Sequence, residues 1–457
     1  MSRTIDQWTW DYWLLQQYTN LFYRSYFKKI FVNNLDYLPR NQPVILAPNH
    51  QNTLIDALAL VYSAKCQPVF LARADVFKGR VLIHFLNFLN IMPIYRMRDG
   101  ASNVRKNEEV FEKTLSVLKS KLNPLCMFPE GTHGDKRRLR PLKKGIFRIA
   151  FMAQEHYKNN PGVKIVPVGM DYSHYQKFRS TLFINFGRPV EVSEYYKVYT
   201  ANSNEGINQL RERLAKEMSE LMIDIQTEEY YDLYQGLRTV YNAEMRKKLK
   251  ITGDSLPDRF IADKRMISAL NEYVEGNPGK ISPLGNKVSE YLKGLDRLNL
   301  RDRVLEKDCY PLLTRLLESL ALFILLPVHI LGIINNYIPY KIPAIYAKKI
   351  KDPQFHSSFK LVMAMVFFPV YYIILIILAL IFFGPWWIKL AYILTLPLTG
   401  LFAFRYYTEL KKLAARFRYS RLVRKKDAKI GELKVLRKDI ISGMNKIVEQ
   451  AINYNKD

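Results

Sequence analysis

Four short segments in the first half of the chain carry side chains that could do chemistry. They are residues 49–56, 93–96, 128–132 and 166–169. The first combines a His with a nearby acid, which suits removal of a proton from a hydroxyl group. The second ends in an Arg, whose planar fork matches two phosphate oxygens at once. Together they indicate an enzyme that deprotonates an alcohol beside a bound phosphate.

His50 is the candidate base, and Asp56 is the candidate group that orients it. The pattern places His50 at the end of a predicted strand, just before a helix that starts near Asn52. A neutral imidazole can accept a proton there when a carboxylate holds its other nitrogen in one tautomer. Asp56 is the only acid close enough in sequence. An isolated Asn-His pair at a strand end more often caps a helix, but the three further segments favour the catalytic interpretation.

The second and third segments form the candidate substrate site. Arg96 is expected to grip a phosphate group. Gly131, followed by Thr132, permits a tight turn whose backbone N–H groups can face an anion. Glu130 can accept hydrogen bonds from hydroxyls of the bound molecule or orient Arg96.

The sequence assigns a function to other residues near these segments less specifically. Lys143 and Lys144 end a dense basic run, which is either a solvated surface or a device that concentrates anionic molecules near the site. Pro167 lies in the fourth segment, which we interpret first as a buried strand of the scaffold. We expect His133 to be a surface residue rather than a second base.

In order and spacing, these segments resemble the motifs of the glycerolipid acyltransferases, the family of bacterial lysophosphatidate acyltransferase (PlsC) and the glycerol-phosphate acyltransferases. The resemblance covers roughly residues 30 to 200. The commonest family pattern has four residues between its His and Asp, whereas this chain has five, with Ile55 at the usual acid position. The extra residue could be absorbed in the turn before the helix. Some glycerol-phosphate acyltransferases of fungal type look like this, which favours glycerol phosphate as the acceptor.

The resemblance implies O-acyl transfer from acyl-CoA or acyl-carrier protein to glycerol 3-phosphate, and possible use of glycerone phosphate. It assigns the acceptor site to the third segment and the donor side to the fourth, which contains Pro167. No metal and no cofactor is implied. Lysophosphatidate or another lysophospholipid is the alternative acceptor, and a non-catalytic lipid-binding scaffold is a more distant alternative.

The charge of the chain indicates an anionic partner. Its formal net charge is +27 and 49% of its residues are hydrophobic. Nucleic acid and an anionic membrane both satisfy that charge, but residues 320–404 place long apolar runs beside Lys and Arg clusters, as membrane proteins do. We therefore expect a membrane and no nucleic acid. Cys66, Cys126 and Cys309 lie too far apart to indicate a disulfide framework or a zinc site.

The elements that must position the four segments alternate in type. Predicted strands cover residues 44–47, 69–72, 92–95, 125–128, 164–168 and 182–186, and predicted helices cover 54–64, 81–89, 107–119 and 144–154. This alternation predicts an α/β domain at residues 32–204, with a mostly parallel sheet flanked by helices, and the resemblance implies that it is the acyltransferase domain. In such sheets the functional segments belong in loops at strand ends.

The segments on either side of this domain have different compositions. Residues 1–31 mix aromatic side chains with cations, which favours an interfacial amphipathic helix over a core helix of the domain. Residues 205–310 are polar with apolar positions at helical spacing, which predicts a helical subdomain. Residues 405–457 read as a basic cytoplasmic tail.

Residues 311–404 form the predicted membrane region. Residues 361–383 and 386–404 are long enough to cross the bilayer as a helical hairpin. Residues 320–338 are shorter and contain Pro327, which predicts a re-entrant segment or a short span. Basic clusters flank the hairpin on both sides, and no secretory signal is visible. We therefore expect a multi-pass membrane protein, in the inner membrane if bacterial, with its catalytic domain on the cytoplasmic side.

Overall fold

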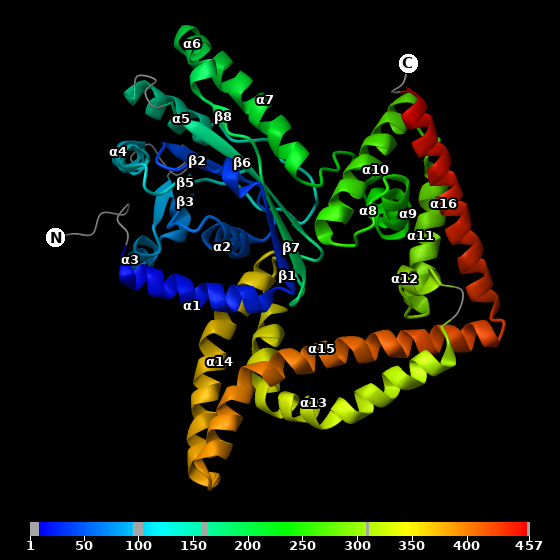
Figure 1. The fold of residues 1–457 in the computed structure, drawn as a ribbon. Helices are drawn as coiled ribbons and strands as arrows, with labels where there is room; N and C mark the ends of the chain where they lie inside the picture. The colour runs from blue at the N-terminus through cyan, green and yellow to red at the C-terminus, as the bar shows by residue number, and fades with distance from the viewer. Residues whose placement is uncertain (1–8, 95–103, 158–161, 308–309, 455–457) are drawn as a thin grey trace. The chain divides into compact units, whose positions relative to one another are not determined.

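The computed structural model describes residues 9–94, 104–157, 162–307 and 310–454. The chain folds into two compact units, drawn in Figure 1. The first unit comprises residues 1–224 and 347–362, and the second comprises residues 225–346 and 363–457. Each unit is therefore built from two separate stretches of the chain.

The first unit is organised around an eight-stranded sheet in the described part of the chain. Its strands are β1 (Lys29–Asn33), β2 (Val44–Pro48), β3 (Val69–Arg73), β4 (Ile91–Ile94), β5 (Leu125–Cys126), β6 (Lys164–Tyr172), β7 (Thr181–Phe186) and β8 (Val190–Glu191). The order is β1-β7-β6-β2-β5-β3-β4, with β8 paired to β6. Strands β2 to β6 are mutually parallel, whereas β7 and β8 run antiparallel to β6. The predicted mostly parallel sheet is confirmed, and β1 and β8 are additions to the prediction.

Helices cover both faces of this sheet. They are α1 (Trp10–Tyr26), α2 (Thr53–Ser63), α3 (Arg80–Phe88), α4 (Val104–Ser120), α5 (Gly145–His156), α6 (Ser193–Ala201) and α7 (Ser203–Leu221), with short 3-10 turns η1 (Leu35–Tyr37) and η2 (Ala74–Val76). Figure 1 shows the sheet between α2 on one side and α5 and α7 on the other. Strand β2 is buried along its whole length, as expected for a strand that is covered on both faces.

Helix α1 differs from the predicted segment 1–31, because it ends at Tyr26 and is followed by strand β1. One face docks on α2, where the Gln16 amide donates to the Val61 carbonyl and the Tyr23 hydroxyl donates to the Ile55 carbonyl. The opposite face exposes Trp10, Trp13, Leu14 and Leu21. A role of that exposed face at a membrane interface stays a prediction.

Helix α7 belongs to the first unit, although its sequence range falls in the predicted helical subdomain. Its buried residues Leu210, Leu214 and Met218 join the hydrophobic core that covers the sheet. The close approach of α7 to β6 depends on Gly169, since a Cβ atom there would lie 1.9 Å from the Leu221 carbonyl oxygen. Helical periodicity shows which face of α7 is apolar, but not which core receives it.

The second unit contains a group of polar-surfaced helices. They are α8 (Tyr231–Val240), α9 (Asn242–Lys248), α10 (Leu256–Gly276), α11 (Ser282–Arg297), α12 (Asp302–Leu305) and α16 (Ala428–Tyr454). Helix α16 comes from the predicted basic tail and packs against α10 and α11. Its Ile440, Met444 and Val448 side chains are fully buried. Much of the tail is therefore a docked helix.

Three further helices are each long and apolar enough to cross a membrane: α13 (Leu312–Ala347), α14 (Phe355–Phe382) and α15 (Trp386–Arg424). Residues 320–338, for which a re-entrant segment or short span was predicted, lie inside α13, which continues through Pro327. Helix α15 extends beyond residue 404 as far as Arg424. How many of these helices cross a bilayer stays a prediction.

The packing at Gly169 gives a first test. Gly169→Ala should lower the free energy of unfolding by about 1–3 kcal/mol, because the added methyl group overlaps the Leu221 backbone and forces α7 away from β6. Gly276→Ala is the matched control, since nothing lies within 4 Å of a Cβ atom at that position. Thermal unfolding of both variants in detergent measures the difference, and equal stability would contradict the described packing.

Candidate active site

The candidate base stands in a tight turn between β2 and α2. Strand β2 ends at Pro48, and α2 begins at Thr53, whose φ of +41° lies in the left-handed region. The turn directs the backbone N–H groups of Gln51 and Asn52 at one oxygen of Asp56, with N to Oδ2 distances of 2.8 and 2.6 Å. With five residues between them, His50 and Asp56 still come into contact across this turn.

The imidazole of His50 is paired with Asp56 at 2.9 Å, measured from Nδ1 to Oδ2. Asp56 is fully buried, and its Oδ1 accepts a 2.6 Å hydrogen bond from the Tyr172 hydroxyl. A carboxylate only accepts hydrogen bonds, so the proton in this pair lies on Nδ1 of His50. The Nε2 atom then carries a lone pair that can accept a proton.

Tyr172, at the end of β6, was missed by sequence reasoning. Burial, reinforced by the nearby charge of Asp56, raises the pKa of the Tyr172 phenol well above its ordinary value. The hydroxyl therefore stays protonated and serves as a permanent donor to Asp56. The only sequence feature that points to Tyr172 is its position three residues beyond Gly169. That position indicates a place near His50 only when β6 is known to pair in parallel with β2.

Glu130 binds the backbone of His50, whereas Asp56 binds its side chain. Its Oε1 accepts the His50 N–H at 2.8 Å, and its Oε2 accepts the Arg140 Nε–H at 2.8 Å. The Arg140 guanidinium in turn donates to the His50 carbonyl at 2.6 Å. Burial raises the pKa of Glu130, and the positive charge of Arg140 opposes that rise. Both oxygens of Glu130 thus accept hydrogen bonds from the protein itself, and a contact of Glu130 with a substrate hydroxyl stays a prediction.

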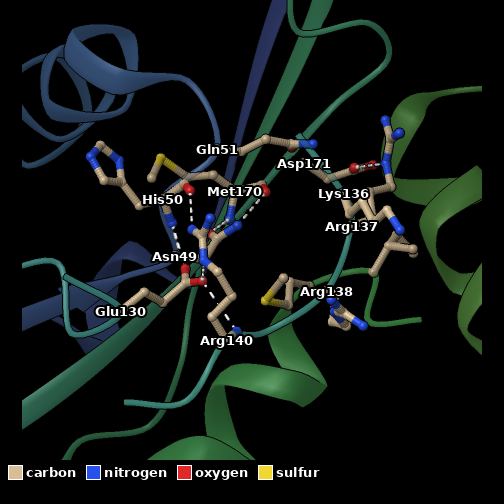
Figure 2. A pocket seen from close by; sticks show the side chains of 12 residues that line it. Asn49, His50, Gln51, Glu130, Lys136, Arg137, Arg138, Arg140, Met170 and Asp171 are labelled. Atoms are coloured by element: carbon tan, nitrogen blue, oxygen red, sulfur yellow. Dashed lines mark hydrogen bonds and ion pairs between the residues drawn. The ribbon is translucent and has the colours of Figure 1, made fainter. Parts of the chain in front are cut away.

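Arg140 is the second residue that the sequence did not single out. It lies in the basic run for which a solvated surface and a steering role were both considered, but its side chain is directed inward. Figure 2 shows a pocket lined by Arg140, Asn49, Lys136 and Asp171 among others, with the His50 imidazole pointing away from the Arg140 guanidinium. This pocket therefore adjoins the His50 backbone, and the proton-accepting face of the ring lies elsewhere.

The ring of His50 is enclosed by aromatic groups. It stacks on Phe128, with 3.9 Å between ring centroids, and its centroid lies 5.8 Å from that of His133. The His50 side chain keeps 16% of its surface exposed, so a small reactant can reach it. Burial lowers the pKa of His133, the nearby Asp352 charge opposes this, and His50 adds to the lowering. His133 is thus a half-buried neighbour of His50, not the surface residue that was expected.

The turn after β5 has the left-handed backbone that its glycine permits. Gly131 has a φ of +70°, a conformation that side chains rarely adopt, and Thr132 beside it is exposed. The Lys143 backbone N–H donates to the Pro129 carbonyl, which places the lysine stem against Gly131. Lys144 directly precedes α5 and is exposed. The two lysines therefore lie at or next to this turn.

Pro167, one of the predicted site residues, is not part of the His50 cluster. Pro167 is buried within β6, opposite Ala47 of β2, so the fourth segment lies inside a strand rather than in a loop at its end. Arg96 lies outside the described residues. Strand β4, which precedes it, ends at Ile94 and runs parallel to β3, so the chain leaves β4 at the same edge of the sheet where it leaves β2.

Residues 347–362, which are distant in sequence, pack beside the turn between β2 and α2 and form one wall of the candidate site. The Ser358 hydroxyl contacts the Thr53 hydroxyl at 2.6 Å, and the Ser357 hydroxyl donates to the Tyr175 carbonyl at 2.7 Å. Phe355 meets the His133 ring edge to face, with 5.0 Å between centroids. Nothing in the sequence around His50 indicates this contribution, because the segment lies about three hundred residues further along the chain.

Residues 29–171 match the family model described as acyltransferase. Residues 29–171 are called the acyltransferase domain from here on, after this match. The chain is 29% identical over 190 residues to glycerol-3-phosphate O-acyltransferase 1 of Saccharomyces cerevisiae, covering 40% of this chain and 24% of that protein. It is 25% identical over 303 residues to glycerol-3-phosphate O-acyltransferase 2 of the same yeast, covering 60% of this chain and 39% of that protein.

Bacterial proteins also resemble the acyltransferase domain. The 1-acyl-sn-glycerol-3-phosphate acyltransferase of Streptococcus pneumoniae is 26% identical over 205 residues, covering 44% of this chain and 68% of that protein. The crystal structure of PlsC from Thermotoga maritima is similar over 46% of this chain and 79% of that chain, with 16% identity and a TM-score of 0.32. The chain thus spans less than two fifths of the length of either yeast relative.

The hydroxyl of Tyr172 provides a test of the Asp56 network in the acyltransferase domain. Tyr172→Phe removes a hydrogen bond to a buried carboxylate and should lower the free energy of unfolding by about 1.5–3 kcal/mol. Tyr175→Phe is the control, because the hydroxyl of this half-buried tyrosine accepts its hydrogen bond from the Gln176 amide and not from a buried charge. Denaturant unfolding compares the two, and equal loss in both variants would show that Tyr172 does not support Asp56.

Arg140 gives a test that depends on pH. Arg140→Ala leaves Glu130 buried without its cation and should destabilise the domain by about 3 kcal/mol near neutral pH. The pKa of Glu130 is already raised, so the folded state takes up its proton at a higher pH than the unfolded chain does. The variant's deficit should therefore shrink as pH falls through the raised pKa, because a neutral Glu130 needs no cation.

The measurement is the unfolding midpoint of Arg140→Ala and of the parent protein at a series of pH values. Arg148→Ala, which alters an exposed residue of α5, is the charge-matched control and should show no such convergence. A deficit that stayed constant with pH would argue against Glu130 as the residue that Arg140 neutralises.

Proposed function

We propose that the protein is a membrane-bound O-acyltransferase that moves a fatty acyl group from acyl-CoA or acyl-carrier protein to glycerol 3-phosphate. The observation that carries the proposal is the 2.9 Å pairing of His50 with a fully buried Asp56 inside an acyltransferase domain. That pairing leaves Nε2 of His50 as a proton acceptor at a partly exposed position, which is what attack by an alcohol requires.

In the proposed mechanism the acceptor hydroxyl attacks the thioester carbonyl carbon while Nε2 of His50 takes its proton. The negative charge of Asp56 stabilises the imidazolium that forms, through the Nδ1–H hydrogen bond. The tetrahedral intermediate collapses by breaking the carbon–sulfur bond. The thiolate receives the proton from His50, so the free thiol and the new ester leave a neutral imidazole behind.

Direct attack is favoured over a covalent acyl-enzyme because the described cysteines are poor nucleophiles. Burial raises the pKa of Cys66 to about 12, and burial raises the pKa of Cys126 well above its ordinary value. Neither thiol would form the thiolate that nucleophilic catalysis needs. The hydroxyl of Thr53 is engaged with Ser358 and with the Gln354 carbonyl, so it is held away from this role.

We assign acceptor binding to Arg96 and to the turn that contains Gly131 and Thr132. The φ of Gly131 suits a turn whose N–H groups face an anion. Lys143 and Lys144 would add positive charge beside that turn and raise the local concentration of phosphate-bearing reactants. Glu130 is a positioning residue in this scheme, since both of its oxygens are taken by His50 and Arg140. Pro167 is part of the scaffold on the donor side.

Glycerol 3-phosphate is the preferred acceptor on two grounds. The chain has the longer His–Asp spacing, and its similarity to yeast glycerol-3-phosphate O-acyltransferase 2 covers 303 residues, which is well beyond the matched domain. The second candidate is a lysophosphatidate acyltransferase, favoured by the similarity to the streptococcal 1-acyl-sn-glycerol-3-phosphate acyltransferase over 68% of that protein. A scaffold without turnover is disfavoured, because the base and its carboxylate are in contact.

We further propose that the protein acts at a membrane, with its catalytic domain on the cytoplasmic side. Three helices are long and apolar enough to cross a bilayer. The net charge of +27 favours lipids with anionic headgroups as the contacting surface. A membrane location would also keep the enzyme where its acyl chains and its products partition.

The decisive assay uses membranes that contain the full chain, labelled acyl-CoA or acyl-carrier protein, and either glycerol 3-phosphate or lysophosphatidate. We expect labelled lysophosphatidate from the first acceptor, with a loss of about 10²- to 10⁴-fold in His50→Ala, the range that general-base catalysis contributes. Asp56→Asn should also lose activity, because an amide cannot stabilise the imidazolium. His84→Ala alters an exposed histidine of α3 and should retain activity.

Product from lysophosphatidate alone would replace the preferred acceptor with the second candidate. Equal activity of His50→Ala and the parent protein would contradict the role of His50 as base. Absence of product with both acceptors and both donors would support the scaffold.

A further inference from the structure

The two ends of α13 are tied to parts of the protein that share one side of any membrane. Among the described residues, no helix before Leu312 is a candidate span. The chain therefore passes from the acyltransferase domain into helices α8 to α12 without crossing a bilayer. Both of these regions, and the start of α13 after them, must lie in the same compartment.

The chain beyond α13 returns to that compartment. Residues 347–362 belong to the first unit, and they are attached to it by several polar contacts. Ser357 and Ser358 are buried and bond to Tyr175 and Thr53, and the Lys360 ammonium donates to the Gln176 carbonyl at 2.7 Å. These contacts can form only on the side of the catalytic domain. A helix that starts and ends on one side of a membrane cannot be a single span.

The contacts of the C-terminal helix α16 likewise show on which side of the membrane it lies. Helix α16 follows α15 and packs against α10 and α11 in the second unit. Arg437 pairs with the buried Asp302 at 2.8 Å, and Asn445 accepts a 2.8 Å hydrogen bond from the Tyr241 hydroxyl. The stretch between residues 363 and 427 therefore starts and ends in this compartment, so any crossing that it makes must be matched by a return. Helices α14 and α15 satisfy that requirement as one outward and one returning span.

The contacts of α13 with α15 show how a continuous helix can approach the far side and return. Near its start, Glu318 forms an ion pair with Arg416. Towards its middle, Asn335 accepts a 2.9 Å hydrogen bond from the Tyr392 hydroxyl, close to the first turns of α15. Further on, the Tyr340 ring lies 6.3 Å from that of Phe404, well back along α15.

Figure 1 shows α13 as a bent helix. Pro327, Pro339 and Pro343 lie inside it, and each lacks the N–H that a straight helix would use. Proline is therefore the physical cause we assign to the bend.

We propose that α13 is a re-entrant helix, which enters and leaves the bilayer on the side of the catalytic domain, and that α14 and α15 alone cross it. Its partner is the acyl-chain region of lipids in that leaflet. Phe323, Ile324 and Ile334 expose 72%, 65% and 62% of their surfaces in the isolated chain, and an apolar groove is lined wholly by residues of α13. Lysines follow the helix at positions 348, 349 and 351, where they can meet lipid phosphates.

The polar side chains of α13 fit this position because most of their contacts are made to the other two helices. The Asn336 amide donates to the Leu396 carbonyl at 3.3 Å and accepts a hydrogen bond from the Tyr372 hydroxyl at 2.5 Å. Gly332 permits this approach, since a Cβ atom there would lie 2.4 Å from the Thr399 carbonyl oxygen. Polar groups at membrane depth require partners of this kind.

This topology brings residues 347–362 to the catalytic turn from the membrane. The segment connects the re-entrant helix to the first span and places Phe355 against His133. One wall of the candidate active site is thus supplied by chain that emerges from one leaflet and immediately enters the bilayer again. The topology itself does not depend on which acyl acceptor is used.

The experiment is cysteine labelling of the full chain in sealed membrane vesicles with a membrane-impermeant maleimide. Cys66, Cys126 and Cys309 are first replaced by Ala, and a single cysteine is then introduced in turn by Lys280→Cys, Lys348→Cys, Lys351→Cys, Gly384→Cys and Lys438→Cys. These positions sample the helical region, the segment after α13, the turn between α14 and α15, and α16. Labelling after detergent solubilisation confirms that each cysteine can react.

The proposal predicts that positions 280, 348, 351 and 438 are labelled from one side and position 384 from the other. Labelling of positions 348, 351 and 438 from the side opposite to position 280 would show that α13 is a true span and would overturn the proposal. Labelling of position 384 from the same side as all the others would overturn it as well. Since no activity is measured, these outcomes are separate from any failure of the acyl-transfer assay.

Discussion

The acyltransferase domain depends on one buried carboxylate. Asp56 is fully buried and accepts hydrogen bonds from the His50 imidazole, the Tyr172 hydroxyl and the N–H groups of Gln51 and Asn52. A buried charge is tolerated only when such donors surround it. These donors come from the turn and from β6, so the sheet register, the entry into α2 and the left-handed backbone of Thr53 must be correct together. The same requirement fixes the tautomer of His50.

A second buried carboxylate fixes the other side of the same residue. Glu130 binds the backbone of His50, while Asp56 binds its side chain. Arg140 closes this arrangement by bonding both Glu130 and the His50 carbonyl. Such support suits a residue that we propose as a catalytic base, because a displacement of about 1 Å can cost two orders of magnitude in rate. The Pro-Glu-Gly turn therefore contributes to the geometry of the base as well as to the site we propose for the acceptor.

Much of this architecture could be predicted from local sequence, and the missing parts share one physical reason. Hydrophobic periodicity located the strands and helices of the sheet, and the spacing of His50, Asp56 and Glu130 identified the turns that meet at its edge. Tyr172 and Arg140 were missed because their roles depend on strand register and on the path of a long loop, which a local pattern does not encode. The same holds for α7 and α16. Their apolar faces could be read from the sequence, but the helices and strands against which those faces pack could not. The wall supplied by Ser358 and Phe355 is the extreme case, since it joins residues about three hundred positions apart.

The first turn of α2 links the catalytic chemistry to the membrane-proximal chain. Asn52, which precedes the helix, makes no side-chain cap, and the N–H groups of Gln51 and Asn52 just before the helix donate instead to the Asp56 carboxylate. The adjoining Thr53 hydroxyl forms a hydrogen bond with the Ser358 hydroxyl, and Ser358 lies in the first turn of α14. A shift of α14 along its axis would therefore act on Thr53, next to the turn that holds His50. In the proposed topology, the position of His50 is thus coupled to that of a membrane-spanning helix.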